Sequence, residues 1–199
     1  MSPTAAAAKH LVYSDTIHGS LKINGFENLE KQMLHGAHAS LASDLSQVKH
    51  VIIDEISMVG SNFFWDINQK LKQLMGSQEY FGGLNVIATG DFHQLPPIGD
   101  QWIFNQTRIC GRCNATATNI WRVYFKMYKL TKHVRSETDK VYSWLQEEIS
   151  VGKVSADMLS HLNKRVEAKC ETEDNNEWYK DGRQVMITPT HETKDRFNV

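Results

Sequence analysis

The stretch that decides the fold is "VIIDEISMVG", residues 51–60. An apolar run that begins at His50 leads directly into two adjacent carboxylates, Asp54 and Glu55. A continuous apolar run of this length is typical of a parallel strand that is buried on both faces. The sequence therefore predicts a buried strand over residues 50–54 that carries two acids at its carboxyl end.

A second stretch, "NVIATGDFHQLPPIG" at residues 85–99, repeats this arrangement. It predicts another buried strand, which ends at Gly90 and Asp91 and is followed by Gln94. Pro96 and Pro97 restrict the backbone of the loop and so favour a fixed position for the Gln94 amide. The alternative is an ordinary proline-rich turn, but the position of this stretch, about thirty residues after a strand that ends in Asp-Glu and with a helix between, argues against it.

A helix is predicted between the two strands. Phe64, Ile67, Leu71 and Leu74 follow one another at helical spacing after Gly60, with Ser61 as the expected cap. Strands that alternate with helices indicate a parallel α/β sheet.

Further elements are predicted along the chain by the same patterns. Residues 14–23 read as a turn and a short extended piece. We expect helices over residues 4–11, 38–48, 137–150 and 155–166, and additional strands over 128–135 and 183–190.

The composition describes an ordinary globular protein. The chain has 199 residues, a formal net charge of −1 and 41% hydrophobic residues. It contains neither a signal-peptide pattern nor an apolar run long enough to cross a membrane, so we expect an intracellular protein without a membrane partner. Three cysteines argue against a disulfide framework, and "CGRC" at residues 110–113 is read as a loop with two free thiols.

The paired acids have a chemical interpretation in nucleoside triphosphatases. A carboxylate at the end of a strand can hold Mg²⁺ through its water shell, and a neighbouring acid can orient or deprotonate the attacking water. A neutral glutamine, such as Gln94, can hydrogen-bond a phosphate without adding negative charge. The competing interpretation of Asp54 and Glu55 is two solvated acids at a strand end.

Three motifs in order resemble one family. "SPTAAAAKHLVYSDTIHGSL", "IIDEISMV" and "GDFHQLPP" resemble motif Ia, the Walker B motif and motif III of the PIF (petite integration frequency) family of superfamily 1 DNA helicases. The similarity extends to RecD-like relatives and to the helicase domains of Helitron-type transposons. "YKLTKHVRSETDKVYSWLQEEISVGK" is similar to the motif IV region, and "ITPTHETKDRFN" to the start of the second RecA-like domain.

The resemblance implies a RecA-like P-loop fold and a 5′-to-3′ translocase on single-stranded DNA, driven by ATP with Mg²⁺. Asp54 would hold Mg²⁺, Glu55 would be the catalytic acid and Gln94 would sense the γ-phosphate. Arg135 would act as an arginine finger from the second domain. Without the resemblance, Arg135 reads as a surface arginine at a helix start.

The resemblance also implies a DNA side of the first domain, formed by Pro3, Thr4, Thr16 and His18. Hydroxyl and backbone groups there can grip phosphates without reading sequence. His18 reads equally as a histidine in a capped turn. The five tryptophans are candidates for base stacking, although most are better interpreted as packing residues. The expected partners are single-stranded DNA and duplex junctions, and the expected state is a monomer.

The phosphate-binding loop of such a site is not present in the sequence. No G-x-x-x-x-G-K-[S/T] occurs in the 199 residues. We therefore expect residues 1–132 to be a first RecA-like domain without its first strand and phosphate loop, and residues 133–199 to begin a second one. Both ends are expected to be truncated, and residues 1–199 alone are expected to lack ATPase activity.

Three other interpretations stay open at this point. One is an ATPase-dead remnant that still binds DNA or a partner. The second is a non-functional gene product. The third is a metal hydrolase that uses Asp54, Asp91 and His93. For the location we expect the nucleus or mitochondrion in a eukaryote, and otherwise the cytoplasm.

Overall fold

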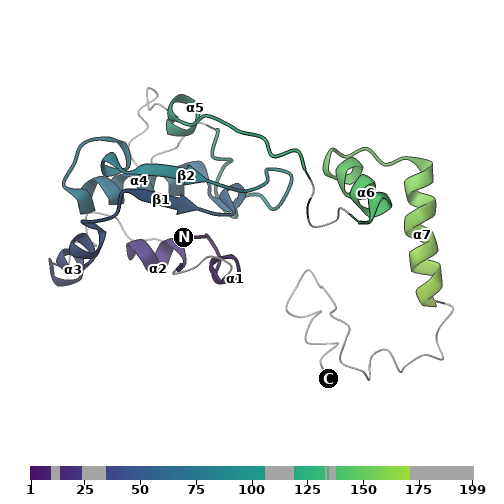
Figure 1. The fold of residues 1–199 in the computed structure, drawn as a ribbon, viewed down its shortest axis with the longest axis horizontal. Helices are drawn as coiled ribbons and strands as arrows, with labels where there is room; N and C mark the ends of the chain where they lie inside the picture. The colour runs from purple at the N-terminus through teal and green to yellow at the C-terminus, as the bar shows by residue number, and fades with distance from the viewer. Residues whose placement is uncertain (10–13, 24–34, 106–118, 133, 135–137, 171–199) are drawn as a thin grey trace, which may run out of the picture. The chain divides into compact units, whose positions relative to one another are not determined.

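The computed structural model describes residues 1–9, 14–23, 35–105, 119–132, 134 and 138–170 (Figure 1). Two compact units make up the chain, Met1–Lys132 and His133–Val199. The predicted strand over residues 183–190 and the CGRC segment lie outside the described residues. None of the helices described is long and apolar enough to span a membrane.

The first unit is an α/β arrangement around two parallel strands. Its elements are α1 (Ala5–Ala8), α2 (Ile17–Leu21), α3 (His35–Leu45), β1 (His50–Ile53), the 3-10 turn η1 (Ile56–Met58), α4 (Ser61–Met75), the 3-10 turn η2 (Tyr80–Gly83), β2 (Asn85–Ala88) and α5 (Ile120–Tyr124). β1 pairs in parallel with β2, in a register that runs from His50 opposite Asn85 to Ile53 opposite Ala88. In the view of Figure 1, α2 and α5 lie on opposite sides of these strands.

The core of this unit lies against one face of the strands. Val51 and Ile53 are buried together with Phe64, Ile67 and Leu71 of α4, which confirms the helical spacing predicted for residues 61–75. The prediction that both strand faces are buried is wrong for the described residues.

The opposite face of the strands carries Ile52 and Ile87, which are 47% and 50% exposed. These two residues are partners in the parallel register, so their side chains share one face of the sheet. The elements that supply the core pack on the other face, and Ile52 and Ile87 are therefore left half-exposed.

Two further local predictions are corrected. The sequence over residues 14–23 contains a helix, α2, because the Thr16 hydroxyl accepts a hydrogen bond from the Gly19 N–H and so caps its first turn. Ser61 is the first helical residue of α4 and not its cap: the N-cap position is Gly60, and the capping side chain is Asp100.

The strand predicted over residues 128–135 is also wrong where the chain is described. No strand is assigned to residues 128–132, and Leu130 is 93% exposed. An extended segment becomes a strand only when it joins the hydrogen-bonded ladder of a sheet, and the sheet of the described residues consists of β1 and β2 alone.

The second unit contains two helices in its described part, α6 (Lys140–Ser150) and α7 (Ala156–Cys170). The Asp139 carboxylate caps α6 by accepting a hydrogen bond from the Tyr142 N–H. Of the face predicted for this helix, Leu145 is buried, whereas Val141 and Ile149 are about half-exposed.

Candidate functional site

The predicted acids lie where the two parallel strands end. The backbone ladder continues past the strands: the Thr89 N–H donates to the Ile53 carbonyl at 2.9 Å, and the Ile56 N–H donates to the Thr89 carbonyl at 2.9 Å. Asp54 therefore lies beside Thr89, and the Thr89 hydroxyl donates a hydrogen bond of 2.7 Å to Asp54 Oδ1. This bond fixes the orientation of a carboxylate at the carboxyl end of β1, which is where ligands bind in open α/β sheets.

Glu55 follows in an unusual backbone conformation. Its φ and ψ are 54° and 47°, the left-handed region that non-glycine residues rarely adopt. Gly90 lies against this turn, and a Cβ placed on it would be 2.8 Å from the Ile56 nitrogen. The absence of a side chain at Gly90 is therefore what allows the end of β2 to approach the Glu55–Ile56 peptide so closely.

Glu55 and Gln94 both line a cavity of about 290 Å³. Three segments that are distant in sequence contribute to its wall: Thr4 at the start of α1, Glu55 with Ser57, and Gln94 with Leu95. Glu55 and Gln94, which have predicted roles in ATP hydrolysis, thus line the same cavity as Thr4, which has a predicted role on the DNA side.

The loop that carries Gln94 is held by its own polar contacts. Asp91 Oδ1 accepts hydrogen bonds from the His93 N–H at 2.9 Å and lies 3.1 Å from His93 Nδ1. The Gln94 N–H donates to the Asp91 carbonyl at 3.0 Å. The hydrogen bond from the His93 backbone lowers the pKa of Asp91, so this carboxylate stays ionised and keeps the turn closed.

The hydrolytic metal site considered above receives no support from this geometry. Across the described ranges, no group of three or more His, Cys, Asp and Glu side chains lies close enough to hold a metal ion. Asp91 and His93 interact with each other as a local turn.

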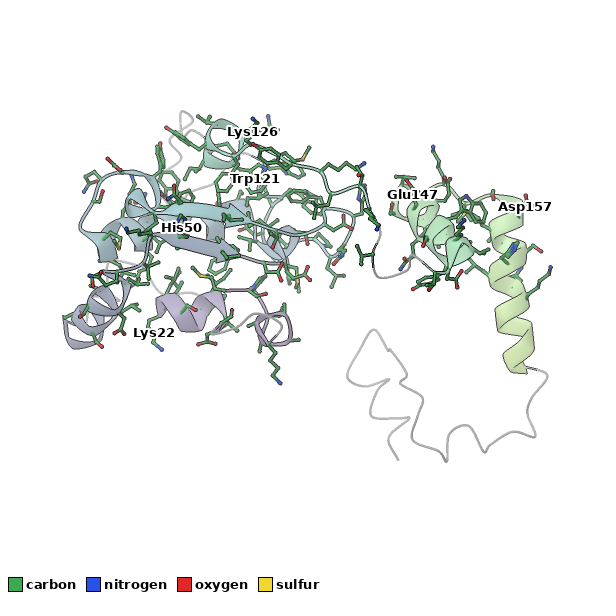
Figure 2. All side chains as sticks on the ribbon, in the orientation of Figure 1. Lys22, His50, Trp121, Lys126, Glu147 and Asp157 are labelled. Carbon is green, nitrogen blue, oxygen red and sulfur yellow. The ribbon has the colours of Figure 1, made fainter. Side chains whose placement is uncertain are left out.

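An aromatic cluster anchors the same loop, and sequence reasoning did not find it. The Phe92 ring meets the rings of Trp102, Phe104 and Trp121 edge-on, with centroid separations of 6.2, 5.7 and 5.8 Å. Trp121 also stacks on Phe125 at 4.7 Å; Figure 2 labels Trp121 among the side chains on the α5 side of the strands. Trp102 and Trp121 are therefore packing residues, as expected. They pack against Phe92, which lies two positions before Gln94 in the same loop.

The four residues predicted for the DNA side lie on two adjacent segments. A parallel bridge joins Ser2 to Thr16, so Pro3 and Thr4 begin beside the start of α2. Both threonines cap helices: Thr4 accepts from the Ala7 N–H at 3.3 Å, and Thr16 accepts from the Gly19 N–H at 3.0 Å.

His18 is exposed and lies in the first turn of α2, which the Thr16 hydroxyl caps. Its ring stacks on Phe63 of α4, with centroids 4.6 Å apart and planes 16° from parallel. Sequence reasoning did not single out Phe63, because the contact joins residues 45 positions apart. Arg135, the predicted arginine finger, lies outside the described residues.

Together, these features define an α/β protein with a RecA-like arrangement of acids at the ends of parallel strands. The model of the PIF1-like helicase family matches residues 2–169. The chain belongs to this family, and the resemblance seen in the sequence is confirmed.

Relatives with curated descriptions agree with the family. The chain is 31% identical over 169 residues to the ATP-dependent DNA helicase PIF1 of Xenopus laevis, which covers 84% of this chain and 25% of the relative. It is 31% identical over 164 residues to PIF1 of Danio rerio, covering 81% of this chain and 24% of the relative. The chain thus spans about a quarter of the length of these relatives.

Solved structures show the same fold. The crystal structure of Bacteroides Pif1 bound to ssDNA matches with a TM-score of 0.66 and 26% identity, covering 82% of this chain and 38% of that one. A structure of two coordinating Pif1 helicases on forked dsDNA matches with a TM-score of 0.65 and 27% identity, covering 81% and 39% of the two chains. The RecA-like α/β fold predicted from the sequence is confirmed.

Proposed function

We propose that the chain is part of an ATP-dependent DNA helicase that moves 5′-to-3′ along single-stranded DNA, in repair, recombination, telomere maintenance or transposition. The observation that carries the proposal is the shared cavity of Glu55 and Gln94 beside the Thr89-oriented Asp54. Support comes from relatives that are named ATP-dependent DNA helicases.

Asp54 is the residue proposed to hold Mg²⁺. A single oriented carboxylate at a strand end, with a hydroxyl beside it, fits an ion that keeps most of its waters and takes its other ligands from a nucleotide. When bound, the ion would neutralise charge that develops on the phosphates.

Glu55 is proposed to act on the attacking water, and Gln94 is proposed to act on the γ-phosphate. The Glu55 carboxylate accepts a proton from the water as it attacks, and the Gln94 amide hydrogen-bonds the γ-phosphate. Their common cavity supports this division of roles, because both side chains can reach one small ligand. Arg135 is proposed as the arginine finger that stabilises charge in the transition state.

The domain assignment is part of the same proposal. We assign residues 1–132 to a first RecA-like domain and residues 133–199 to the beginning of a second one. The DNA side of the first domain is formed by Pro3, Thr4, Thr16 and His18, and its partners are single-stranded DNA and duplex junctions. The helicase acts as a monomer, in the nucleus or mitochondrion of a eukaryote or in the cytoplasm of a bacterium.

The test measures ATP hydrolysis and strand separation by the product of the complete reading frame, with residues 1–199 assayed in parallel. We expect hydrolysis that single-stranded DNA stimulates, and unwinding of a duplex with a 5′ tail but not of one with a 3′ tail. Glu55→Gln should abolish both activities, whereas Glu79→Gln, at an exposed position before η2, should leave them unchanged. Unwinding that requires a 3′ tail, or activity that survives Glu55→Gln, would overturn the proposal.

An ATPase-dead DNA-binding protein is the second candidate, because no G-x-x-x-x-G-K-[S/T] occurs in the 199 residues. Backbone amides and the lysine of that loop supply much of the binding energy for phosphates. Salt-sensitive binding of single-stranded DNA without ATP hydrolysis in the same assays would favour this candidate.

A further inference from the structure

We propose that Phe63 is a positioning residue that holds the His18 ring flat, as a platform on which one base of single-stranded DNA stacks. This inference rests on the DNA side assigned above. It adds Phe63 of α4 to the residues of the DNA side. It also adds stacking on a base, a contact that the hydroxyl groups of Thr4 and Thr16 do not provide.

The geometry of the two rings carries the inference. The imidazole and phenyl planes are 16° from parallel, with centroids 4.6 Å apart. Phe63 is half-buried and packs against the hydrophobic core, whereas His18 is exposed. One ring of the pair is therefore fixed by the core, and the other is presented to solvent.

Both rings belong to residues in the first turn of a helix, and hydrogen bonds to capping side chains fix the backbone of each turn. The Phe63 N–H donates to Asp100 Oδ2 at 3.1 Å, so the first turn of α4 is tied to a residue far along the chain. On α2, the Thr16 hydroxyl accepts from the Gly19 N–H and fixes the turn that contains His18. A ring with little remaining freedom loses little conformational entropy when a ligand stacks on it.

The ligand that fits such a platform is an unpaired base. Proteins that bind single strands without sequence preference combine contacts to the backbone with aromatic side chains on which bases stack. Because His18 is exposed, the ring face that does not contact Phe63 is available to a ligand. The Thr16 hydroxyl lies two residues away, where the proposed phosphate contacts begin.

The experiment compares two fluorescein-labelled probes by anisotropy, using the full 199-residue chain. One probe is a thymidine oligonucleotide, and the other is an abasic oligonucleotide of the same length, which keeps the phosphates but has no bases. The variants are His18→Ala, Phe63→Leu and Phe63→Tyr. Tyr124→Leu is the control, because it removes a ring from a different aromatic pair. In that pair, Tyr124 of α5 packs against Tyr80 of η2.

We expect His18→Ala and Phe63→Leu each to weaken binding of the thymidine probe about fivefold or more, which corresponds to the loss of one stacked base. The abasic probe should bind all variants equally, and both Phe63→Tyr and Tyr124→Leu should bind like the unchanged protein. Thermal unfolding of each variant is measured first; if Phe63→Leu does not fold, Phe63→Met, which also lacks a ring and has a similar volume, takes its place.

Three results would overturn the inference. Equal binding of the thymidine probe by Phe63→Leu and the unchanged protein would remove the positioning role and leave the helicase proposal intact. An equal loss with the abasic probe would show that the contact is to the backbone. Failure of the unchanged chain to bind either probe would remove the platform together with the DNA side assigned to these residues.

Discussion

The Thr89 hydroxyl donates a 2.7 Å hydrogen bond to Asp54 Oδ1 and so joins the ends of two parallel strands that are 35 residues apart in sequence. The bond is exposed, so its net contribution to stability is small. Its consequence is orientation, because it determines how the carboxylate proposed for Mg²⁺ is presented.

Thr89→Val should therefore change metal dependence more than stability. Partners that orient a ligating carboxylate typically affect metal affinity about tenfold or more, so the Mg²⁺ concentration for half-maximal ATP hydrolysis by the product of the complete reading frame should rise by about that factor. The free energy of unfolding should change by less than about 1 kcal/mol. Thr89→Ser keeps the hydroxyl and should behave like the unchanged protein. An unaltered Mg²⁺ titration in Thr89→Val would argue against a role of Asp54 at the ion.

Asp66 should make the stability of the protein depend on pH. Burial, with a further contribution from the Asp100 carboxylate, raises the pKa of Asp66 from 3.8 to about 6. The folded state therefore binds the proton more tightly than the unfolded state, and stability falls as the pH rises from about 4 to about 6. The full difference in pKa corresponds to about 3 kcal/mol, and the partial exposure of the group reduces the expected effect to about 1–2 kcal/mol.

Asp66→Asn should accordingly stabilise the protein by about 1–2 kcal/mol near neutral pH and by close to zero near pH 4, as measured by urea unfolding. Asp44→Asn, at an exposed position of α3, is the matched control and should show no such dependence on pH. A gain in stability that is the same at both pH values would contradict the assignment to Asp66 ionisation.

Asp100 should be a main determinant of the stability of α4. Its Oδ2 accepts hydrogen bonds from the Asn62 and Phe63 N–H groups, each at 3.1 Å, and its Oδ1 accepts from Asn62 Nδ2 at 2.7 Å. Loss of a helix cap typically costs about 0.5–2 kcal/mol, and a carboxylate gains further from the helix dipole. Asp100→Ala should thus lower the free energy of unfolding by about 2 kcal/mol, whereas Ser61→Ala should have the smaller effect, although Ser61 is the cap expected from the sequence. The reverse order in urea unfolding would refute the remote cap.

Gly90 should tolerate no side chain. A Cβ there would lie 2.8 Å from the Ile56 nitrogen, whereas a Cβ on Gly99 would meet nothing within 4 Å. Gly90 has a φ of 153° and Gly99 a φ of 71°, so Gly99→Ala is a reference for a side chain added at positive φ without a clash. Gly90→Ala should cost about 1–3 kcal/mol more than Gly99→Ala in unfolding experiments, because the clash forces the ends of the strands apart. Equal costs would argue against a clash between a side chain at position 90 and the Ile56 nitrogen.

Local patterns in the sequence predicted the elements that local physics decides. The spacing of Phe64, Ile67 and Leu71 identified α4, and the apolar runs before Asp54 and Asp91 identified the two parallel strands. The order of the three motifs identified the family. Each of these signals is contained within a few adjacent residues, where periodicity and strand-end chemistry are visible without knowledge of the tertiary structure.

Apart from α2, which a local Thr16 cap forms, the features that sequence reasoning missed depend on contacts between distant segments. The cap of α4 comes from Asp100, 38 residues after Asn62, so the local candidate Ser61 was preferred wrongly. The packing of Phe92 on Trp102 and Trp121, and the stack of His18 on Phe63, join segments that no periodic pattern connects. Burial of a strand likewise depends on what covers each face, and this is why Ile52 and Ile87 were predicted buried and are half-exposed.

The Asp100 cap also closes a ring within the first unit. The Ser61 N–H donates to the Gln101 carbonyl at 3.0 Å, and an antiparallel bridge joins Gly60 to Trp102, so the chain from α4 through β2 and the Gln94 loop returns to its starting point. One carboxylate thereby links the loop that follows Gln94 to the helical turn that carries Phe63. A displacement of this loop that released Asp100 would loosen the support of the His18 ring. Such linkage is reciprocal. Single-stranded DNA with a base stacked on the His18 ring would therefore stabilise the loop conformation in which Asp100 caps α4.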